Sequence, residues 1–204
     1  MYKKPVIIFE GIEGSGKTTH INYVAQYLKK KKISFIKIRE PGGCKNSEKI
    51  RKLILNNKSN FNRNTDLLLY EASRSENIEQ LKKLYKKKII LIDRFIDSTI
   101  AYQHFGLGVN LSLIKTINSH LLKNFKIDFT FLNLVNKKNM HKRLRLRNKL
   151  NRYDKFRFNF YNKVQNGYLK LAKRKKNKDM IINSNLEIRF NKKMILKKID
   201  KLIK

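Results

Sequence analysis

Apolar residues follow two different periods along this chain, and segments of the two periods alternate. Five short runs are typical of β-strands: residues 6–9, 33–38, 88–92, 129–134 and 179–183. In the other segments apolar residues recur every three or four positions, which is typical of amphipathic helices: residues 19–30, 47–55, 65–84, 97–103, 111–122, 153–173 and 188–203. This alternation predicts a three-layer α/β fold, a doubly wound, parallel, five-stranded sheet with helices on both faces.

The chain of 204 residues has no internal repeat and no linker, so we expect a single domain over residues 1–204. No apolar run approaches the roughly 18 residues of a membrane span. The start, Met1 to Pro5, leads directly into an apolar strand and leaves no room for a signal peptide. The single cysteine, Cys44, excludes an internal disulfide and suits a reducing compartment. We therefore expect a cytoplasmic protein without a membrane segment.

The formal charge of +34 comes from 49 Lys and Arg residues against 15 Asp and Glu residues. Such an excess suggests a polyanionic partner such as nucleic acid. The alternative is the codon bias of an AT-rich genome. Lysines occur in nearly every segment rather than on one face, which favours the second interpretation. We expect non-specific attraction of nucleic acid at most, and faster encounter with anionic substrates.

Directly behind the first apolar run, the chain fits the phosphate-binding pattern G-x-x-x-x-G-K-[ST]. Glycines let consecutive backbone N–H groups point at an anion, and the next helix adds the positive end of its dipole. Lys17 would reach the β- and γ-phosphates, and the Thr18 hydroxyl would bind Mg²⁺. A chance glycine-rich hairpin would not lie between a buried strand and an amphipathic helix. The residues expected to bind a nucleoside triphosphate are Gly11, Ile12, Glu13, Gly14, Ser15, Gly16, Lys17, Thr18 and Thr19.

Charged residues also end two further predicted strands. Arg39-Glu40-Pro41 follows the second strand, and Asp93-Arg94 follows the third. Ligands bind at the carboxyl ends of the strands in open parallel sheets, so both groups are expected near the phosphate loop. An acid in the place of Asp93 commonly organises Mg²⁺ in phosphate-loop enzymes. A surface ion pair and a helix-capping aspartate are the structural alternatives.

Two segments admit two interpretations each. Tyr70, Arg74 and Asn77 share one helix face, which is either a solvated surface or a wall that reads a base. Residues 139–155 are strongly basic, with Arg143 and Arg147 one helical turn apart. This segment is either a nucleic-acid arm or a lid whose arginines neutralise charge on a transferring phosphoryl group.

Together these motifs resemble the bacterial thymidylate kinase family over essentially the whole chain. The motifs that carry the resemblance are Phe9-Glu10-Gly11 through Thr19, Arg39-Glu40-Pro41-Gly42-Gly43, Ala72-Ser73-Arg74, Asp93-Arg94-Phe95, Asp97-Ser98-Thr99 and Ala101-Tyr102-Gln103. The resemblance implies a nucleotide-kinase fold and transfer of the γ-phosphoryl group of ATP to dTMP with Mg²⁺, giving dTDP and ADP. It also implies a homodimer.

The same resemblance assigns roles to matching residues. The metal would lie at Thr18 and Asp93, and Arg39 and Arg94 would bind the dTMP phosphate. The residues implied to contact dTMP are Glu13, Arg39, Pro41, Arg51, Tyr70, Arg74, Arg94, Thr99, Tyr102 and Gln103. The residues implied to act in phosphoryl transfer are Lys17, Asp93, Arg94 and the lid arginines Arg143, Arg147 and Arg152.

Within the acceptor set, the resemblance separates the base from the sugar. Arg74 would hydrogen-bond thymine and Tyr70 would stack on it, while Thr99 and Gln103 would contact the base edge. Tyr102 would crowd the 2′ position of the sugar and disfavour ribonucleotides. The acceptor phosphate is already anionic, so no general base is required, and catalysis is positioning and charge neutralisation.

The chain departs from the family pattern at two places. Where relatives commonly have a glycine-rich loop Gly-x-x-Arg-Gly, we expect a loop over His104-Phe105-Gly106-Leu107-Gly108, which lacks the arginine. In the lid, Phe156-Arg157 replaces an expected acidic residue. Both changes predict weakened turnover rather than a new function.

Two other functions remain as alternatives. One is a different nucleoside monophosphate kinase or a deoxynucleoside kinase; Arg74, Tyr102 and Gln103 favour a thymine deoxynucleotide instead. The other is a phosphate-loop protein that has lost kinase activity and binds nucleic acid through its charge. The retention of Lys17 and Asp93 beside the other motifs favours a kinase.

Overall fold

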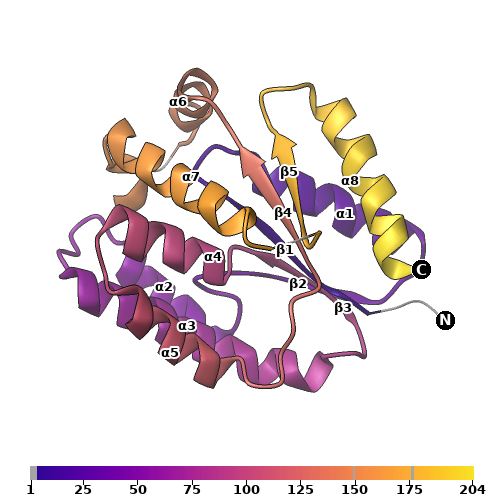
Figure 1. Ribbon diagram of the computed structural model, residues 1–204, viewed down its shortest axis with the longest axis horizontal. Helices are drawn as coiled ribbons and strands as arrows, with labels where there is room; N and C mark the ends of the chain where they lie inside the picture. The colour runs from indigo at the N-terminus through magenta and orange to yellow at the C-terminus, as the bar shows by residue number, and fades with distance from the viewer. Residues whose placement is uncertain (1–3, 149, 176) are drawn as a thin grey trace.

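The computed structural model describes residues 4–148, 150–175 and 177–204, so residue 149 of the predicted lid lies outside the described part. At its centre is a parallel sheet of five strands in the order β2-β3-β1-β4-β5 (Figure 1). The strands are β1 (Val6–Gly11), β2 (Phe35–Arg39), β3 (Ile89–Asp93), β4 (Phe129–Leu134) and β5 (Asp179–Asn183). The prediction of a doubly wound, parallel sheet is confirmed.

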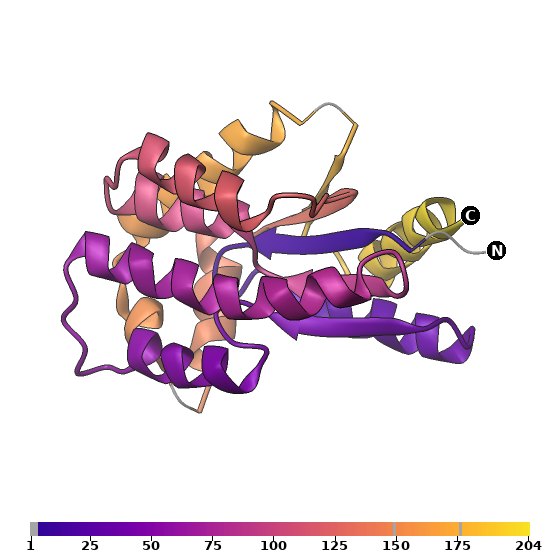
Figure 2. The same cartoon turned by 90° about the horizontal axis from the view of Figure 1, so that it is seen from below.

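Helices cover both faces of this sheet. Helices α1 and α8 lie on one face, and α3, α4 and α7 lie on the other (Figures 1 and 2). The helices are α1 (Lys17–Lys30), α2 (Lys45–Leu55), α3 (Arg63–Leu84), α4 (Ile96–Thr99), the π-helix η1 (Ile100–Gly106), α5 (Leu111–Leu121), α6 (Lys137–Arg145), the 3₁₀ turn η2 (Arg152–Lys155), α7 (Phe158–Ala172) and α8 (Ile188–Ile203).

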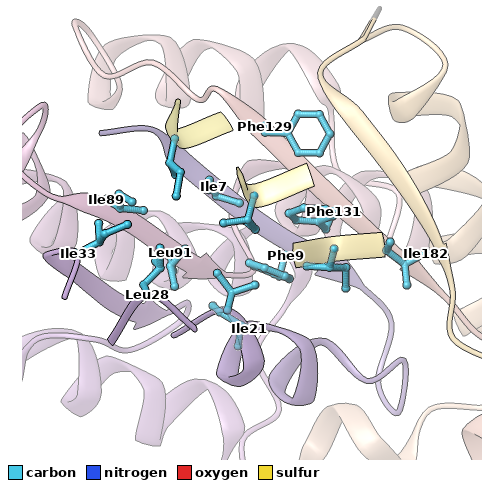
Figure 3. Packing of buried hydrophobic residues seen from close by; sticks show 14 residues of the cluster. Ile7, Phe9, Ile21, Leu28, Ile33, Ile89, Leu91, Phe129, Phe131 and Ile182 are labelled. Atoms are coloured by element: carbon cyan, nitrogen blue, oxygen red, sulfur yellow. The ribbon is translucent and has the colours of Figure 1, made fainter. Parts of the chain in front are cut away.

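The central strand β1 is buried along its whole length because both faces of the sheet are covered. Ile7 and Phe9 pack with Leu28 of α1, and the Phe9 and Phe131 rings stack with centroids 5.1 Å apart (Figure 3). Val6 and Ile8 belong to the core cluster on the opposite face. The alternation of side chains along one strand therefore builds both core layers.

The segment after β3 departs from its prediction. Residues 104–108 were expected to form a loop, but the π-helix η1 continues to Gly106. A Cβ atom on Gly106 would lie 2.6 Å from the Phe160 ring, and one on Gly167 would lie 2.5 Å from the Phe105 ring. Each glycine thus faces an aromatic ring of the other helix, which allows η1 and α7 to pack closely. Gly106 is therefore a close-packing residue inside a helix rather than the sign of a loop.

The predicted helix over residues 153–173 is interrupted. A 3₁₀ turn capped by Asn151 and Asp154 comes first, the chain is extended at Phe156, and α7 begins only at Phe158. The Phe156 ring stacks on Phe160 with centroids 4.0 Å apart. The apolar spacing continues through the interruption because η2 and α7 pack against the same hydrophobic core.

Candidate active site

A cavity of about 220 Å³ opens at the carboxyl ends of β1, β2 and β3. Strand register brings these ends together, because Arg39 pairs with Asp93 and Asp93 with Phe9. The predicted site residues that line the cavity are Glu13, Lys17, Thr18, Arg39, Pro41, Arg51, Tyr70, Asp93, Arg94, Tyr102, Gln103 and Arg147. One cavity thus joins motifs that lie far apart in the sequence.

The phosphate loop enters α1 through Gly16, whose φ of 84° is a left-handed conformation that suits glycine. The Lys17 ammonium group turns back into the loop and donates to the Ile12 carbonyl at 2.9 Å and to Ser15 Oγ at 3.4 Å. Burial, followed by the nearby Arg94 guanidinium, lowers the pKa of Lys17 to about 8. An anion bound in this loop would stabilise the charged ammonium form.

Thr18 and Asp93 supply oxygen ligands beside the loop. The Thr18 hydroxyl donates to Asp93 Oδ2 at 3.1 Å. The described part of the chain has no cluster of three or more His, Cys, Asp or Glu side chains that could hold a metal ion. One carboxylate and one hydroxyl, completed by phosphate and water, fit Mg²⁺, which commonly binds with few protein ligands.

Arg94, Glu13 and Tyr102 form a hydrogen-bonded group at the centre of the cavity. Arg94 adopts a left-handed φ of 69°, and its guanidinium donates to Gly11 O at 2.9 Å and to Glu13 Oε1 at 2.7 Å. The Tyr102 hydroxyl donates to the other oxygen of Glu13. Burial alone would raise the pKa of Glu13, but Arg94 and Lys17 hold it below its ordinary value. Glu13 is therefore a carboxylate.

Arg39 and Arg51 lie on the β2 side of the cavity. Arg39 pairs with Glu48 at 3.2 Å and is 56% exposed, whereas Arg51 donates to the Pro41 carbonyl at 2.5 Å and is half-buried. Burial, followed by Arg39, lowers the pKa of Arg51. Together with Arg94 they provide guanidinium groups for a bound anion.

Tyr70, Tyr153 and Gln103 form an aromatic and amide wall. The Tyr70 and Tyr153 rings meet edge to face with centroids 5.9 Å apart. Gln103 Nε2 donates to the Tyr153 hydroxyl at 3.3 Å. Gln103 Oε1 is buried and has no hydrogen-bond partner among the described residues. This wall can accept a planar ring that brings its own N–H donor.

Arg74 and Thr99 were expected at the base edge, but neither lines the cavity. Arg74 is 1% exposed, and its guanidinium donates to Glu40 Oε2 and Asn118 Oδ1 at 2.8 Å each and to Thr99 Oγ1 at 2.9 Å. It also contacts Glu71 at 3.1 Å. These four partners engage all three nitrogens of the guanidinium, so Arg74 lies behind the wall rather than in it.

The three lid arginines occupy different places. Arg143 donates to Gly14 O at 2.9 Å and to Ser184 O at 2.6 Å, across the phosphate loop. Arg147 lies beyond the end of α6, so it is not one helical turn from Arg143; it lines the cavity and pairs with Asp154. Arg152 pairs with Asp66 outside the cavity.

Sequence reasoning gave no role to Glu10 or Tyr153. Glu10, inside β1, accepts from the N–H groups of Phe95 at 2.8 Å and Ser98 at 3.2 Å and so caps α4. Burial, followed by Asp97, raises the pKa of Glu10 to about 7. An acid within an apolar strand was the available signal for Glu10. Tyr153 gave no such signal, because aromatic spacing is equally typical of a core helix.

Leu107, which stands where the family commonly has an arginine, lies in a second cavity. That cavity is lined by Arg63, Arg152, Lys155 and other residues. Leu107 therefore shares this second cavity with three cations, the acid Asp66 and two phenylalanines, and it does not line the cavity that holds the phosphate loop.

Comparisons with known proteins point to a single family. The family model described as thymidylate kinase matches residues 9–195. The thymidylate kinase of Thermosipho africanus (strain TCF52B) is 41% identical over 173 residues, covering 84% of this chain and 86% of the relative. That of Acholeplasma laidlawii (strain PG-8A) is 37% identical over 191 residues, covering 89% and 92%. The crystal structure of thymidylate kinase from Ehrlichia chaffeensis superposes with a TM-score of 0.78 at 31% identity, covering 97% of this chain and 98% of that one.

The Arg74 cluster makes a prediction about stability. Arg74→Ala leaves the buried carboxylates of Glu40 and Glu71 without their cation. We expect it to lower the free energy of unfolding by about 3–5 kcal/mol, measured by urea denaturation. The matched control is Arg39→Ala, which removes an exposed pair and should cost no more than about 1 kcal/mol. Equal losses in the two variants would contradict the structural role of Arg74.

Proposed function

The chain belongs to the thymidylate kinase family, and from that premise we propose that it transfers the γ-phosphoryl group of ATP to dTMP in the cytoplasm, as a step of dTTP synthesis. The observation that carries this proposal is the single cavity in which the phosphate loop faces a wall of arginine, tyrosine and glutamine side chains. A donor site and an acceptor site in one cavity are what a direct transfer between two nucleotides requires.

The donor half is the phosphate loop with its neighbours. Backbone N–H groups of residues 11–19 and the Lys17 ammonium would hold the β- and γ-phosphates of ATP. Thr18 and Asp93 would hold Mg²⁺, which neutralises phosphate charge when bound. Arg143, fixed across the loop, adds a cation on this side.

The acceptor phosphate would bind to Arg39, Arg51 and Arg94. Arg94 is held rigidly by Glu13 and the Gly11 carbonyl, so it can align the phosphate oxygen that attacks. That oxygen is already anionic, and no side chain has to remove a proton from it. The contribution of these residues is positioning and charge neutralisation.

The sugar and base would occupy the remaining wall. The Glu13 carboxylate would accept from the 3′-hydroxyl, and Tyr102, which is bonded to Glu13, would crowd a 2′-hydroxyl. Tyr70 supplies a ring face for stacking. Gln103 Oε1, which has no hydrogen-bond partner in the described part of the chain, supports recognition of an N–H on the base edge, as at N3 of thymine. In this proposal Arg74 and Thr99 do not contact the base; they support the wall from behind.

The segment 139–155 would act as a lid, within a chain that folds as one domain. Arg147 lines the cavity but is paired with Asp154, so its guanidinium is available when that pair opens. Arg152 supports the lid from outside the cavity rather than contacting phosphate. None of the helices in the described ranges has the length and apolarity needed to cross a membrane.

We further propose that the active protein is a homodimer, which family membership supports. An apolar hollow beside α5, lined by Ile96, Ile100, Ile114 and Leu122, is a candidate contact region. Sedimentation equilibrium should give twice the chain mass of 24.4 kDa. A single-chain mass at micromolar concentration would contradict the dimer but leave the activity unaffected.

The acceptor preference tests the function itself. With ATP, Mg²⁺ and moderate salt, we expect dTMP to be the preferred acceptor among dTMP, dUMP, the thymine ribonucleotide, dCMP and AMP, measured by ADP release. Against dCMP, whose base edge would leave a buried polar group unpaired, we expect discrimination of about 10⁴-fold; dUMP lacks only a methyl group, which is worth about 10–200-fold. Preference for another monophosphate, or no transfer despite ATP binding, would contradict the proposal.

The role of Lys17 makes a separate prediction. Lys17→Ala should reduce kcat by at least about 10²–10³-fold, because it removes a preorganised charge from the transferring phosphoryl group. The control is Lys29→Ala, which changes an exposed lysine of the same helix and should leave kcat unchanged. Circular dichroism should show the same fold for both variants. Unchanged turnover in the Lys17 variant would contradict the mechanism.

A further inference from the structure

Asp66 is a buried acid that the proposed function leaves without a role. It lies in the first turn of α3, one helical turn before Tyr70, and is 2% exposed. Its Oδ1 accepts from the Arg152 guanidinium, and its Oδ2 accepts from the Tyr153 hydroxyl. Arg152 and Tyr153 belong to the end of the lid segment. A single carboxylate therefore joins the lid to the helix that carries the stacking tyrosine.

The Tyr153 hydroxyl donates its proton to Asp66, and this determines the direction of the hydrogen bond between Gln103 and Tyr153. Burial, followed by Tyr70 and Asp66, raises the pKa of Tyr153 well above its ordinary value, so the hydroxyl keeps its proton. That proton points at Asp66, and the hydroxyl oxygen accepts from Gln103 Nε2 at 3.3 Å. The chain of donors runs from Gln103 through Tyr153 to Asp66.

The direction of the hydrogen bond between Gln103 and Tyr153 determines which atom of the Gln103 amide can bind a ligand. Nε2 is bonded to Tyr153, so Oε1, buried and without a partner among the residues described, is an acceptor. If the amide rotated by half a turn, its oxygen would require the Tyr153 proton, and Asp66 Oδ2 would lose its donor. A buried carboxylate oxygen without a donor is costly, so the observed orientation is the stable one.

Arg152 holds Asp66 in place for this task. Its guanidinium donates to the other carboxylate oxygen, and the carbonyl of Leu150, two residues earlier in the lid, accepts from Asn57 at 3.0 Å. The carboxylate therefore cannot turn away from Tyr153 without breaking an ion pair. The amide orientation depends on a network that extends beyond the cavity.

We propose that Asp66 is a specificity-determining positioning residue. Acting through Tyr153, it keeps Gln103 Oε1 as an acceptor, so the site takes a pyrimidine with an N–H at N3 and rejects one whose N3 is itself an acceptor. Thymine and uracil have that N–H, and neutral cytosine does not. The inference rests on the proposed function, because it assumes that a pyrimidine monophosphate occupies the wall.

Two variants test the relay without removing its packing. Tyr153→Phe keeps the ring and deletes only the hydroxyl; Asp66→Asn keeps the volume and deletes the charge. In both, the Gln103 amide becomes free to rotate. We expect the KM for dTMP to rise about three- to tenfold, with a smaller change in kcat, since one hydrogen bond is lost. The ratio of kcat/KM for dTMP to that for dCMP should fall at least about tenfold.

The matched control is Asp200→Asn. Asp200 also accepts from a tyrosine hydroxyl and a cation, Tyr27 and Lys31, but it lies on α8 away from the cavity. Its variant should keep the dTMP to dCMP ratio of the unaltered protein. Calorimetric binding of dTMP and dCMP to each variant gives the same ratio independently of turnover.

The outcomes separate this inference from the proposed function. If the unaltered protein neither binds nor phosphorylates dTMP, the proposed function fails and the relay fails with it. If the unaltered protein prefers dTMP and folded Tyr153→Phe keeps both the ratio and the KM, the relay alone is overturned. An equal loss for all acceptors, without a change in the ratio, would show that Asp66 is merely structural. If Asp66→Asn does not fold, Tyr153→Phe still decides.

Discussion

The proposed acceptor half of the active site depends on one buried cation. Arg74 is surrounded by groups from four segments: Glu40 after β2, Glu71 on α3, Thr99 at the end of α4 and Asn118 on α5. A guanidinium has five donors in a fixed plane, so its partners must come to it from set directions. The segments that carry Pro41, Tyr70 and Tyr102 are thereby fixed relative to one another.

The charged side chains that line the cavity determine its electrostatic potential. Five cations, Lys17, Arg39, Arg51, Arg94 and Arg147, line it against three carboxylates, Glu13, Glu40 and Asp93. Glu40 is neutralised by Arg74 from behind, and Glu13 is shared between Arg94 and Tyr102. Arg39 and Arg147 pair with Glu48 and Asp154, and the other three cations, Lys17, Arg51 and Arg94, donate to backbone carbonyls. Such a site is organised for phosphate groups before they arrive, and it needs little rearrangement to bind them.

The fold was predictable from the sequence because periodicity reports which face of an element is buried. The phosphate loop was predictable because its chemistry is local: Gly16, Lys17 and Thr18 act within a few residues of one another. The order of the strands was not, since periodicity carries no information about neighbours. That Asp93 and Arg39 lie near the cavity could be inferred only from the rule that the carboxyl ends of parallel strands meet at one edge of the sheet.

Roles that depend on distant partners were less predictable. Arg74 was expected to face the base, but the acids that capture it, Glu40 and Glu71, give no sign in the sequence that they converge on it. The expectation of a loop at residues 104–108 was wrong up to Gly106, where the facing Phe160 ring, distant in the sequence, explains a glycine inside a helix. Tyr153 could not be separated from core aromatics without its bond to Asp66.

The two ends of the lid are anchored differently, and this limits what it can do. Arg143 ties the first end to the phosphate loop, and Arg152 ties the second to α3 through Asp66. A movement that keeps both anchors is confined to the residues between them, among which Arg147 is the cation that lines the cavity. Its partner Asp154 lies beside the second anchor. The arrangement therefore allows Arg147 to change partner while Tyr153, and with it the wall proposed to bind the base, stays in place.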